Sequence, residues 1–222
     1  MPDADTSSRP PLSRERVLRA AIELADRDGL GALTMRRLGA ELGVEAMSLY
    51  KHVANKEEIL DGIVDLVVGE ISIPDQGTHW KKAMRRRATS AREVLSRHSW
   101  AIGLLEARGS TGPAALRYLN AILGNLRSAG FSIENAAHAF WLLDSYVYGH
   151  VIQETSMPIS TSGDTTDSRR SIFGQDTIDQ YPHLVEIGEH AQRSGFSFDR
   201  EFEFGLDLIL EALDRAATSA EG

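Results

Sequence analysis

Apolar residues recur at intervals of three and four positions along most of the chain, which is the spacing of one face of an α-helix. Near the N-terminus, Leu18, Ala21 and Ile22 follow this pattern after Ser13, which can cap a helix, and Gly29 ends it. No alternating run of strand length competes with the helical pattern. The pattern therefore predicts an all-α fold whose first helix lies between Ser13 and Gly29.

Asn55 is the clearest helix start of the chain, because it can cap a helix while Glu58, three residues later, completes a capping box. We expect this helix to run to about Ser72. Further helices, separated by Gly, Pro and Ser, are expected over about 78–97, 99–107, 112–128, 132–154, 181–193 and 199–217. Asp199 should cap the last helix. Residues 156–180 are rich in Ser, Thr, Asp and Gly and are interpreted as a long mobile loop.

Residues 34–56 hold a short helical pattern, a turn with glycine and a second short helical pattern, between two longer amphipathic segments. This spacing predicts a helix-turn-helix, the arrangement that places a short helix in the major groove of DNA. The apolar side of the two short helices is formed by Leu38, Leu42, Val44, Leu49 and Val53. Polar residues on the other side stay available for DNA, so the sequence predicts a DNA-binding regulator.

Three motifs of this segment resemble those of a known family. They are T-x-R-x-L-x-x-x-L-G-V at 34–44, L-Y-x-H-V at 49–53 and N-K-E at 55–57. Together they resemble the TetR family of bacterial repressors. Looser matches to its tetracycline-repressor branch lie at Trp80, His98, 130–136 and 202–213. The resemblance implies an N-terminal three-helix helix-turn-helix head that binds DNA and a larger C-terminal helical body for ligand binding and dimerisation.

The predicted organisation has three parts: a flexible arm at 1–11, a helix-turn-helix DNA-binding domain with its linking helix at 12–72, and a ligand-binding and dimerisation domain at 73–222. Residues 1–56 hold nine Lys and Arg against eight Asp and Glu, whereas the rest of the chain holds fifteen against twenty-four. The negative charge behind the net value of −8 therefore lies in the body, and the head can still contact phosphates.

The resemblance implies contacts between the head and double-stranded operator DNA. The residues expected at phosphates are Thr34, Ser48, Tyr50, His52 and Lys56. Arg36 is expected to reach a base edge, most suitably guanine. Ala46, Met47 and Lys51 stand where the tetracycline repressor has Gln, Pro and Trp, so a different operator is expected. Ala46 and Met47 can contact thymine methyl groups only by apolar packing.

The resemblance also implies a cavity for a small-molecule effector in the body. Positions of the tetracycline repressor's magnesium-linked histidines fall on Ser72 and about Leu105, and its pocket Asn and Thr fall on Arg87 and Arg108. We therefore expect an unidentified effector rather than tetracycline with magnesium. The candidate ligand-binding residues are Leu104, Arg108, Leu119, Ile122, Leu123, Phe140, Trp141 and Asp144. Two alternatives remain: the apolar members are plain core, and Arg108 pairs with Asp144.

A recognition helix of about seven residues reads only about four base pairs, which is too little for one genomic site. We therefore expect a homodimer on a palindromic operator, formed through a four-helix bundle of residues 132–154 and 199–217. An intrachain core is the alternative for these two helices. The basic residues within 78–97 are either a second nucleic-acid surface or, with fewer assumptions, a solvated helix face packed near the acidic body.

Several classes are disfavoured by the sequence. The chain has no Cys, no signal-peptide pattern and no apolar stretch of bilayer length, so a cytoplasmic protein without membrane insertion is expected. It has no G-x-S-x-G elbow or P-loop, and neither a cofactor nor a metal is expected. A helical metal protein or enzyme, based on the pairs His150/Glu154 and Glu186/His190, is a remote alternative. A ligand-dependent activator of the same fold is the nearer alternative to a repressor.

Overall fold

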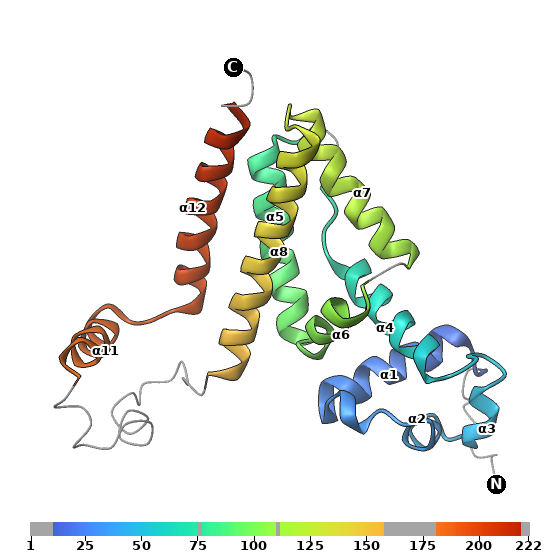
Figure 1. Ribbon diagram of the computed structural model, residues 1–222. Helices are drawn as coiled ribbons and strands as arrows, with labels where there is room; N and C mark the ends of the chain where they lie inside the picture. The colour runs from blue at the N-terminus through green and yellow to red at the C-terminus, as the bar shows by residue number, and fades with distance from the viewer. Residues whose placement is uncertain (1–10, 75–76, 110–111, 158–180, 219–222) are drawn as a thin grey trace, which may run out of the picture. The chain divides into compact units, whose positions relative to one another are not determined.

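The computed structural model describes residues 11–74, 77–109, 112–157 and 181–218, and every element within these ranges is a helix (Figure 1). The elements are α1 (Arg14–Asp28), the 3₁₀ turn η1 (Leu30–Ala32), α2 (Met35–Leu42), α3 (Ala46–Leu49), α4 (Lys56–Glu70), α5 (Trp80–Arg97), α6 (Trp100–Arg108), α7 (Pro113–Ser128), α8 (Ile133–Ser156), α11 (Pro182–Ser194) and α12 (Phe198–Thr218). The predicted all-α class is confirmed. Residues 1–10 of the predicted arm and residues 158–180 of the loop predicted at 156–180 lie outside the described residues, and Ser156 belongs to α8 rather than to the loop.

The predicted ends of α1 are confirmed. The Ser13 hydroxyl accepts a hydrogen bond from the Arg16 amide at 3.2 Å, and Gly29, at φ 76°, donates its amide to Ala25 at 2.9 Å. α4 begins as predicted, because the Asn55 side chain accepts from the Glu58 amide at 2.8 Å. It ends at Glu70, slightly before the expected end.

The predicted cap of α12 is wrong. The helix begins at Phe198, so Asp199 lies inside its first turn. There the Asp199 carboxylate pairs with Arg92 of α5 at 2.7 Å. A tertiary ion pair, rather than a local cap, therefore occupies this side chain.

The structure divides into two compact units. The first holds the described residues up to Ile73 together with Glu93–Ile122, and the second holds Pro74–Arg92 and the described residues from Leu123 onward. The boundaries between them fall within α5 and α7. Residues 93–122, which the linear domain prediction places in the C-terminal part, thus pack with the N-terminal segment.

The core of the first unit lies where α1 crosses α4. The apolar face of α1 is buried, including Leu18 and Leu24, and it meets the buried face of α4 with Ile59, Ile63 and others. A side chain at Gly62 would bring a Cβ atom to 2.8 Å from Leu18, so glycine allows the two helices to approach closely. This packing fixes the helix-turn-helix on α4.

In the second unit α12 packs on α8 and is also joined to α5 by charged side chains. On α12, Phe202, Leu206, Leu210 and Leu213 form the buried stripe. The cations of α5 face acids of α12: Lys81 lies 2.9 Å from both Glu211 and Asp214, Arg85 lies 2.7 Å from Glu203 and also pairs with Asp207, and Arg92 pairs with Asp199. The simpler interpretation of the basic segment, a solvated face packed near acids, is supported for Lys81 and Arg85, whereas Arg87 is buried.

No helix in the described ranges is both long and apolar enough to cross a membrane.

Candidate nucleic-acid interface

Three small residues shape α2 and its turn to α3. Thr34 caps α2, because its hydroxyl oxygen accepts from the Arg37 amide at 3.2 Å. Gly43 ends α2 in the left-handed conformation, at φ 69°, where glycine is least strained. A Cβ at Gly39 would lie 2.8 Å from the Val44 carbonyl oxygen, so glycine lets the start of α3 approach α2. The helix-turn-helix angle is therefore set by backbone fit.

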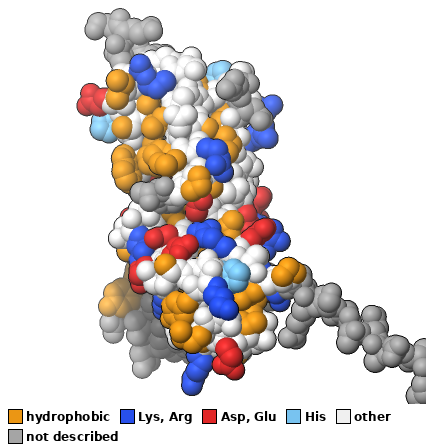
Figure 2. All heavy atoms as spheres, turned by 90° about the vertical axis from the view of Figure 1, so that its right-hand side faces the viewer, with side chains coloured by type: hydrophobic (Ala, Val, Ile, Leu, Met, Phe, Trp, Pro, Cys, Tyr) orange, Lys and Arg blue, Asp and Glu red, His pale blue; other side chains and the backbone are white. Residues whose placement is uncertain are grey.

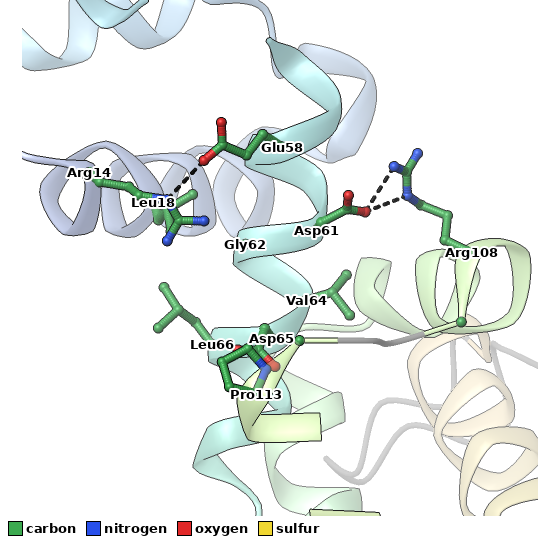
Figure 3. A pocket seen from close by; sticks show the side chains of 12 residues that line it. Arg14, Leu18, Glu58, Asp61, Gly62, Val64, Asp65, Leu66, Arg108 and Pro113 are labelled. Atoms are coloured by element: carbon green, nitrogen blue, oxygen red, sulfur yellow. Dashed lines mark hydrogen bonds and ion pairs between the residues drawn. The ribbon is translucent and has the colours of Figure 1, made fainter. Parts of the chain in front are cut away.

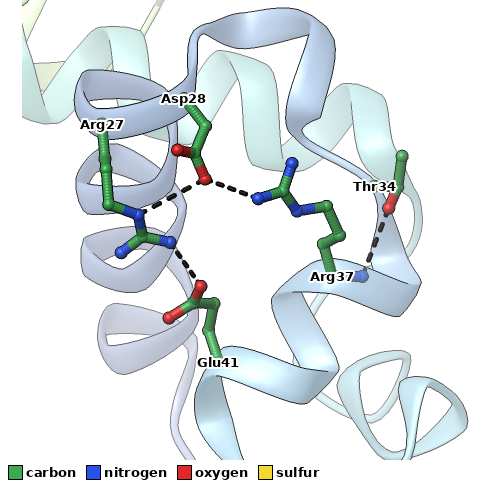
Figure 4. Close-up of polar contacts among 5 residues, drawn as sticks. All are labelled: Arg27, Asp28, Thr34, Arg37 and Glu41. Atoms are coloured by element: carbon green, nitrogen blue, oxygen red, sulfur yellow. Dashed lines mark hydrogen bonds and ion pairs between the residues drawn. The ribbon is translucent and has the colours of Figure 1, made fainter.

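Four charged side chains join α1 to α2 (Figure 4). Asp28, at the end of α1, accepts from Arg37 of α2 at 2.5 Å and from Arg27 at 3.3 Å. Arg27 also pairs with Glu41 of α2, and this hydrogen bond, together with the Glu41 charge, raises the pKa of Arg27. The network positions α2 on α1. Arg36, the residue next to Arg37, takes no part in it.

The expected reading residues lie on the solvent side of this motif. Met47 is 74% exposed and Tyr50 is 45% exposed, although both are large hydrophobic side chains. The others are exposed or half-buried, namely Thr34, Arg36, Ala46, Ser48, Lys51, His52 and Lys56. Leu49 and Val53, on the opposite side, are buried. The structure thus brings the nine predicted DNA contacts to the accessible part of one motif.

α3 itself is shorter than expected. Its α-helical part spans only Ala46–Leu49, and tighter hydrogen bonds continue the chain, with the amide of Lys51 bonded to Ser48 and that of His52 to Leu49. Tyr50, Lys51 and His52 therefore lie on a turn that extends the short helix. Only the first part of the segment expected to form a recognition helix of about seven residues is α-helical.

Within the described part of the chain, the cations Arg36, Lys51 and Lys56 take part in no ion pair, whereas Arg37 is held by Asp28. Figure 2 shows Lys, Arg and His side chains among hydrophobic and acidic ones in the lower part of the face drawn. Unpaired guanidinium and ammonium groups beside a helix-turn-helix suit phosphates and guanine edges. Because the Thr34 oxygen already accepts a bond, its hydroxyl hydrogen remains for a phosphate.

α4 begins at Lys56, soon after the turn at residues 50–52, and its start is stabilised by the Glu58 side chain. Glu58 accepts from the Ala54 amide at 2.7 Å rather than from Asn55, and its carboxylate also accepts from Arg14 of α1 at 3.0 Å. The Ala54 amide, and then Arg14, lower the pKa of Glu58. The capping box is therefore displaced by one residue and also ties α4 to α1.

Another face of α4 carries acids at every fourth position, Glu57, Asp61 and Asp65, as Figure 3 shows in part. Arg108, at the end of α6, donates to Asp61 at 2.9 Å and pairs with Glu57, and these two carboxylates raise the pKa of Arg108. The alternative that Arg108 pairs with Asp144 is wrong. Arg108 faces α4, and Asp144 of α8 is held by Arg87 of α5.

A hollow of about 540 Å³ lies in the first unit, beside these acids (Figure 3). Its lining comes from α1, α4, the end of α6 and the start of α7, and includes Leu18, Gly62 and Pro113. Of the predicted ligand-binding residues, Arg108 belongs to this described lining. The charged side chains around it are already paired within the protein, among them Arg14 with Glu58 and Arg108 with Asp61.

The other predicted ligand-binding residues are divided between the two units. In the first unit, Leu104 and Ile122 are buried and Leu119 is half-buried. The members in the second unit are Leu123, Phe140, Trp141 and Asp144. Leu123 and Phe140 are half-buried and Trp141 is 65% exposed, so Trp141 lies at the surface of the isolated chain. Asp144 is buried with Arg87, whose guanidinium lies 5.7 Å from the Phe140 ring.

His150 and Glu154, one of the two pairs behind the metal-protein alternative, contact other residues. Glu154 accepts two hydrogen bonds from Arg92, at 2.6 and 2.9 Å. His150 is buried against the rings of Phe198, Phe202 and Tyr146. Among the described residues no group of three or more His, Cys, Asp or Glu side chains is arranged to hold a metal ion.

Two family models match the chain. One, described as "Bacterial regulatory proteins, tetR family", matches residues 17–63, which contain the helix-turn-helix. The other, described as "Tetracyclin repressor-like, C-terminal domain", matches residues 73–216. The chain belongs to the TetR family. The resemblance predicted from the motifs is confirmed, as is the division into a DNA-binding head and a C-terminal helical domain.

Individual relatives agree with this assignment. An HTH-type transcriptional regulator of Saccharopolyspora erythraea is 35% identical over 69% of this chain and 66% of its own length. The HTH-type transcriptional repressor DrrR1 of Streptomyces coeruleorubidus is 30% identical over 96% and 82%, and the Escherichia coli tetracycline repressor protein class C is 32% identical over 92% and 91%. The structure of apo ActR from Streptomyces coelicolor has a TM-score of 0.76 at 29% identity, with 96% of this chain and all of that one covered.

Motif reading missed the three acids on α4. They were visible in the sequence as Glu57, Asp61 and Asp65, a four-residue spacing that places carboxylates on one helix face. A further signal was Gly112 before Pro113, a helix start without a capping side chain. Neither signal names the partner, which only the tertiary structure supplies.

Proposed function

We propose that this TetR-family chain represses transcription by binding a palindromic operator as a homodimer, and that a small-molecule inducer releases it. The observation that carries the proposal is the exposed reading surface. Arg36 and Lys51 are cations outside any ion pair of the described residues, and Met47 is a large apolar side chain in solvent. Side chains that are not needed for the fold and that suit phosphates and base edges are best explained by DNA.

A homodimer through α8 and α12 is supported by apolar side chains that the isolated chain leaves in solvent. On α8, Trp141 is 65% exposed and Ile152 is 50% exposed, and on α12, Phe204 is 65% and Leu208 is 57% exposed. Apolar surface on two long neighbouring helices favours association with a second copy. The two heads would then read two half-sites of one operator.

The effector is proposed to be an organic molecule other than tetracycline with magnesium. The resemblance places the tetracycline repressor's magnesium-linked histidines at Ser72 and about Leu105, where the chain offers no imidazole and, at Leu105, no ligating atom. ActR, at 29% identity, has been solved with actinorhodin and with (S)-DNPA, which supports a regulator of organic molecules here. The eight predicted residues remain the candidate contacts. We propose no catalytic activity and no resident cofactor, and a cytoplasmic location suits operator binding.

The test is selection of genomic DNA fragments with the purified full chain, followed by gel shifts of the selected fragment at stated salt. We expect a palindrome that binds the wild type and binds Tyr50→Ala and His52→Ala much more weakly. Glu106→Ala, an exposed change on α6, serves as the control and should bind like wild type. Failure to select any DNA at low salt would contradict operator binding.

Repression and activation are separated by transcription in vitro from a promoter that carries the selected operator. A repressor lowers transcript yield when added alone, and an effector that weakens the gel shift restores the yield. Higher yield on addition of protein, or tighter DNA binding with effector, would instead assign the ligand-dependent activator.

A further inference from the structure

Asp65 of α4 caps the N-terminus of a different helix. Its Oδ1 atom accepts the amide of Ala114 at 2.9 Å and that of Ala115 at 3.0 Å, and Oδ2 lies 3.3 Å from the Ala114 amide. These are two of the amides at the start of α7 that have no partner within their own helix. A carboxylate is the strongest acceptor for them, because it also meets the positive end of the helix dipole.

The start of α7 is built to receive this carboxylate. The carbonyl of Gly112 accepts the first helical bond, from the Leu116 amide at 3.0 Å, so Gly112 occupies the capping position. Glycine has no side chain with which to cap its own helix. A Cβ atom at Gly112 would overlap the Asp65 carboxylate. The two residues therefore fit only as an interhelical pair.

The same face of α4 also holds the end of α6, through Asp61 and Arg108, whose Oδ1 and Nη2 atoms lie 2.8 Å apart. A second face of α4 holds α1 through the Glu58 contact with Arg14. One face of α4 is thus joined to α1, and another face is joined to the end of α6 and the start of α7. All of these contacts lie within the first unit.

We propose that Asp65 is a positioning residue for operator recognition: by capping α7 from α4, it fixes the direction in which the reading residues are presented. The inference rests on the proposed operator binding and adds a residue that does not touch DNA. A palindromic operator requires its half-sites at one separation, since one base pair more or less turns a half-site by about 35° and moves it by about 3.4 Å. A looser α4 would tolerate such changes.

A merely structural role for the cap is separated from positioning by a pair of variants. Asp65→Ala removes both the cap of α7 and the hydrogen bonds that join α7 to α4. Ser132→Ala removes the cap of another helix, α8, where the Ser132 hydroxyl accepts from the Asn135 amide at 3.0 Å, so it lowers stability without a change on α4 or α7. Glu106→Ala removes an exposed carboxylate of α6 as the matched control. The full chain is used throughout, well below the melting temperature of every variant.

Dissociation constants are measured for the selected operator and for versions with one base pair added or removed between half-sites. We expect wild type, Glu106→Ala and Ser132→Ala to prefer the selected spacing by about tenfold or more, although Ser132→Ala has a lowered melting temperature. Asp65→Ala should prefer it by less than about threefold. If Asp65→Ala is as selective as wild type, the inference is overturned, because the cap then serves stability alone. An equal loss of selectivity in Ser132→Ala would overturn it as well. Equal loss of selectivity in Glu106→Ala would also overturn it. If the wild type binds no operator, the proposed function fails and this inference fails with it.

Discussion

The Tyr146 hydroxyl of α8 donates a hydrogen bond to the main-chain oxygen of Phe202 on α12, at 2.8 Å, and its ring stacks on the Phe202 ring with centroids 5.5 Å apart. This contact needs glycine at the next turn of α12. A Cβ at Gly205 would lie 2.8 Å from two ring carbons of Tyr146. One glycine therefore decides how closely the two helices proposed for dimerisation pack within a chain.

Gly205→Ala should lower the free energy of unfolding by about 1–3 kcal/mol, because the added methyl displaces a ring that cannot flex away without losing its hydrogen bond. Gly124→Ala is the matched control in α7, where a Cβ meets nothing within 4 Å. It should raise the free energy of unfolding by about 0.5–1 kcal/mol through helix propensity. Urea unfolding measures both, and equal effects of the two changes would contradict the close fit.

Arg36 and Arg37 are neighbours with different expected roles. Arg36→Ala should weaken discrimination at one base pair of each half-site by about 1–3 kcal/mol, since a guanidinium that reads guanine is lost. Arg37→Ala removes the ion pair with Asp28 and should cost about 0–1 kcal/mol of stability without changing base preference. Binding to operators with single base changes measures both. Uniform weakening by Arg36→Ala across all sequences would make Arg36 a phosphate contact instead.

Met47 should read thymine through its 5-methyl group. Replacing that thymine by uracil removes one methyl and should weaken wild-type binding about fourfold, the equivalent of about 0.8 kcal/mol for one buried methyl. Met47→Ala should bind the two operators equally. Competition between thymine and uracil operators measures the difference, and each thymine of the half-site is replaced in turn. No position sensitive to uracil in the wild type would exclude methyl recognition.

Stability should fall as the solution is acidified, in part because of His150. Burial, and then the charge of Arg92, lower the pKa of His150 from its ordinary value of 6.5, while Glu154 and Asp199 partly oppose the shift. Between the lowered folded value and 6.5 the unfolded chain binds more protons, so the free energy of unfolding decreases as the pH falls through this interval. The slope is at most about 1.4 kcal/mol per pH unit.

His150→Leu should remove that part of the pH dependence and keep the apolar contacts with Phe198 and Phe202. Urea unfolding of both proteins at a series of pH values below neutrality measures the slopes. His138→Leu, at an exposed position of the same helix, is the control and should keep the wild-type slope. Identical slopes in wild type and His150→Leu would show that His150 does not contribute.

The helix starts at Ser13 and Asn55 were predictable because a cap is a local interaction, complete within four residues of sequence. The same reasoning failed at Asp199, where a residue suited to a cap is drawn into an ion pair with Arg92. Local propensity and tertiary pairing compete for the same carboxylate. Local propensity can be inferred from the sequence, whereas the tertiary ion pair cannot.

The solvent exposure of the expected DNA contacts was also predictable, because their motif has fixed spacing and its solvent side is the side without leucine and valine. The partners of Arg108 and Asp144 were not. Each is a charged residue on an amphipathic helix, and nothing in its neighbourhood along the chain indicates which of many opposite charges it will meet. In the structure Arg108 forms ion pairs with acids of α4, and Asp144 forms one with Arg87.

The ion pairs of Arg27 and Arg37, the Thr34 cap and the close fit at Gly39 hold the motif together without using Met47 or Lys51. The side chains that stabilise the motif are thus different from those proposed to contact bases. Substitutions at the two outward positions should alter the preferred operator at little cost in stability. During evolution such a regulator could acquire new target genes by single changes, and the same two positions are the natural place to diversify a library for engineered DNA specificity.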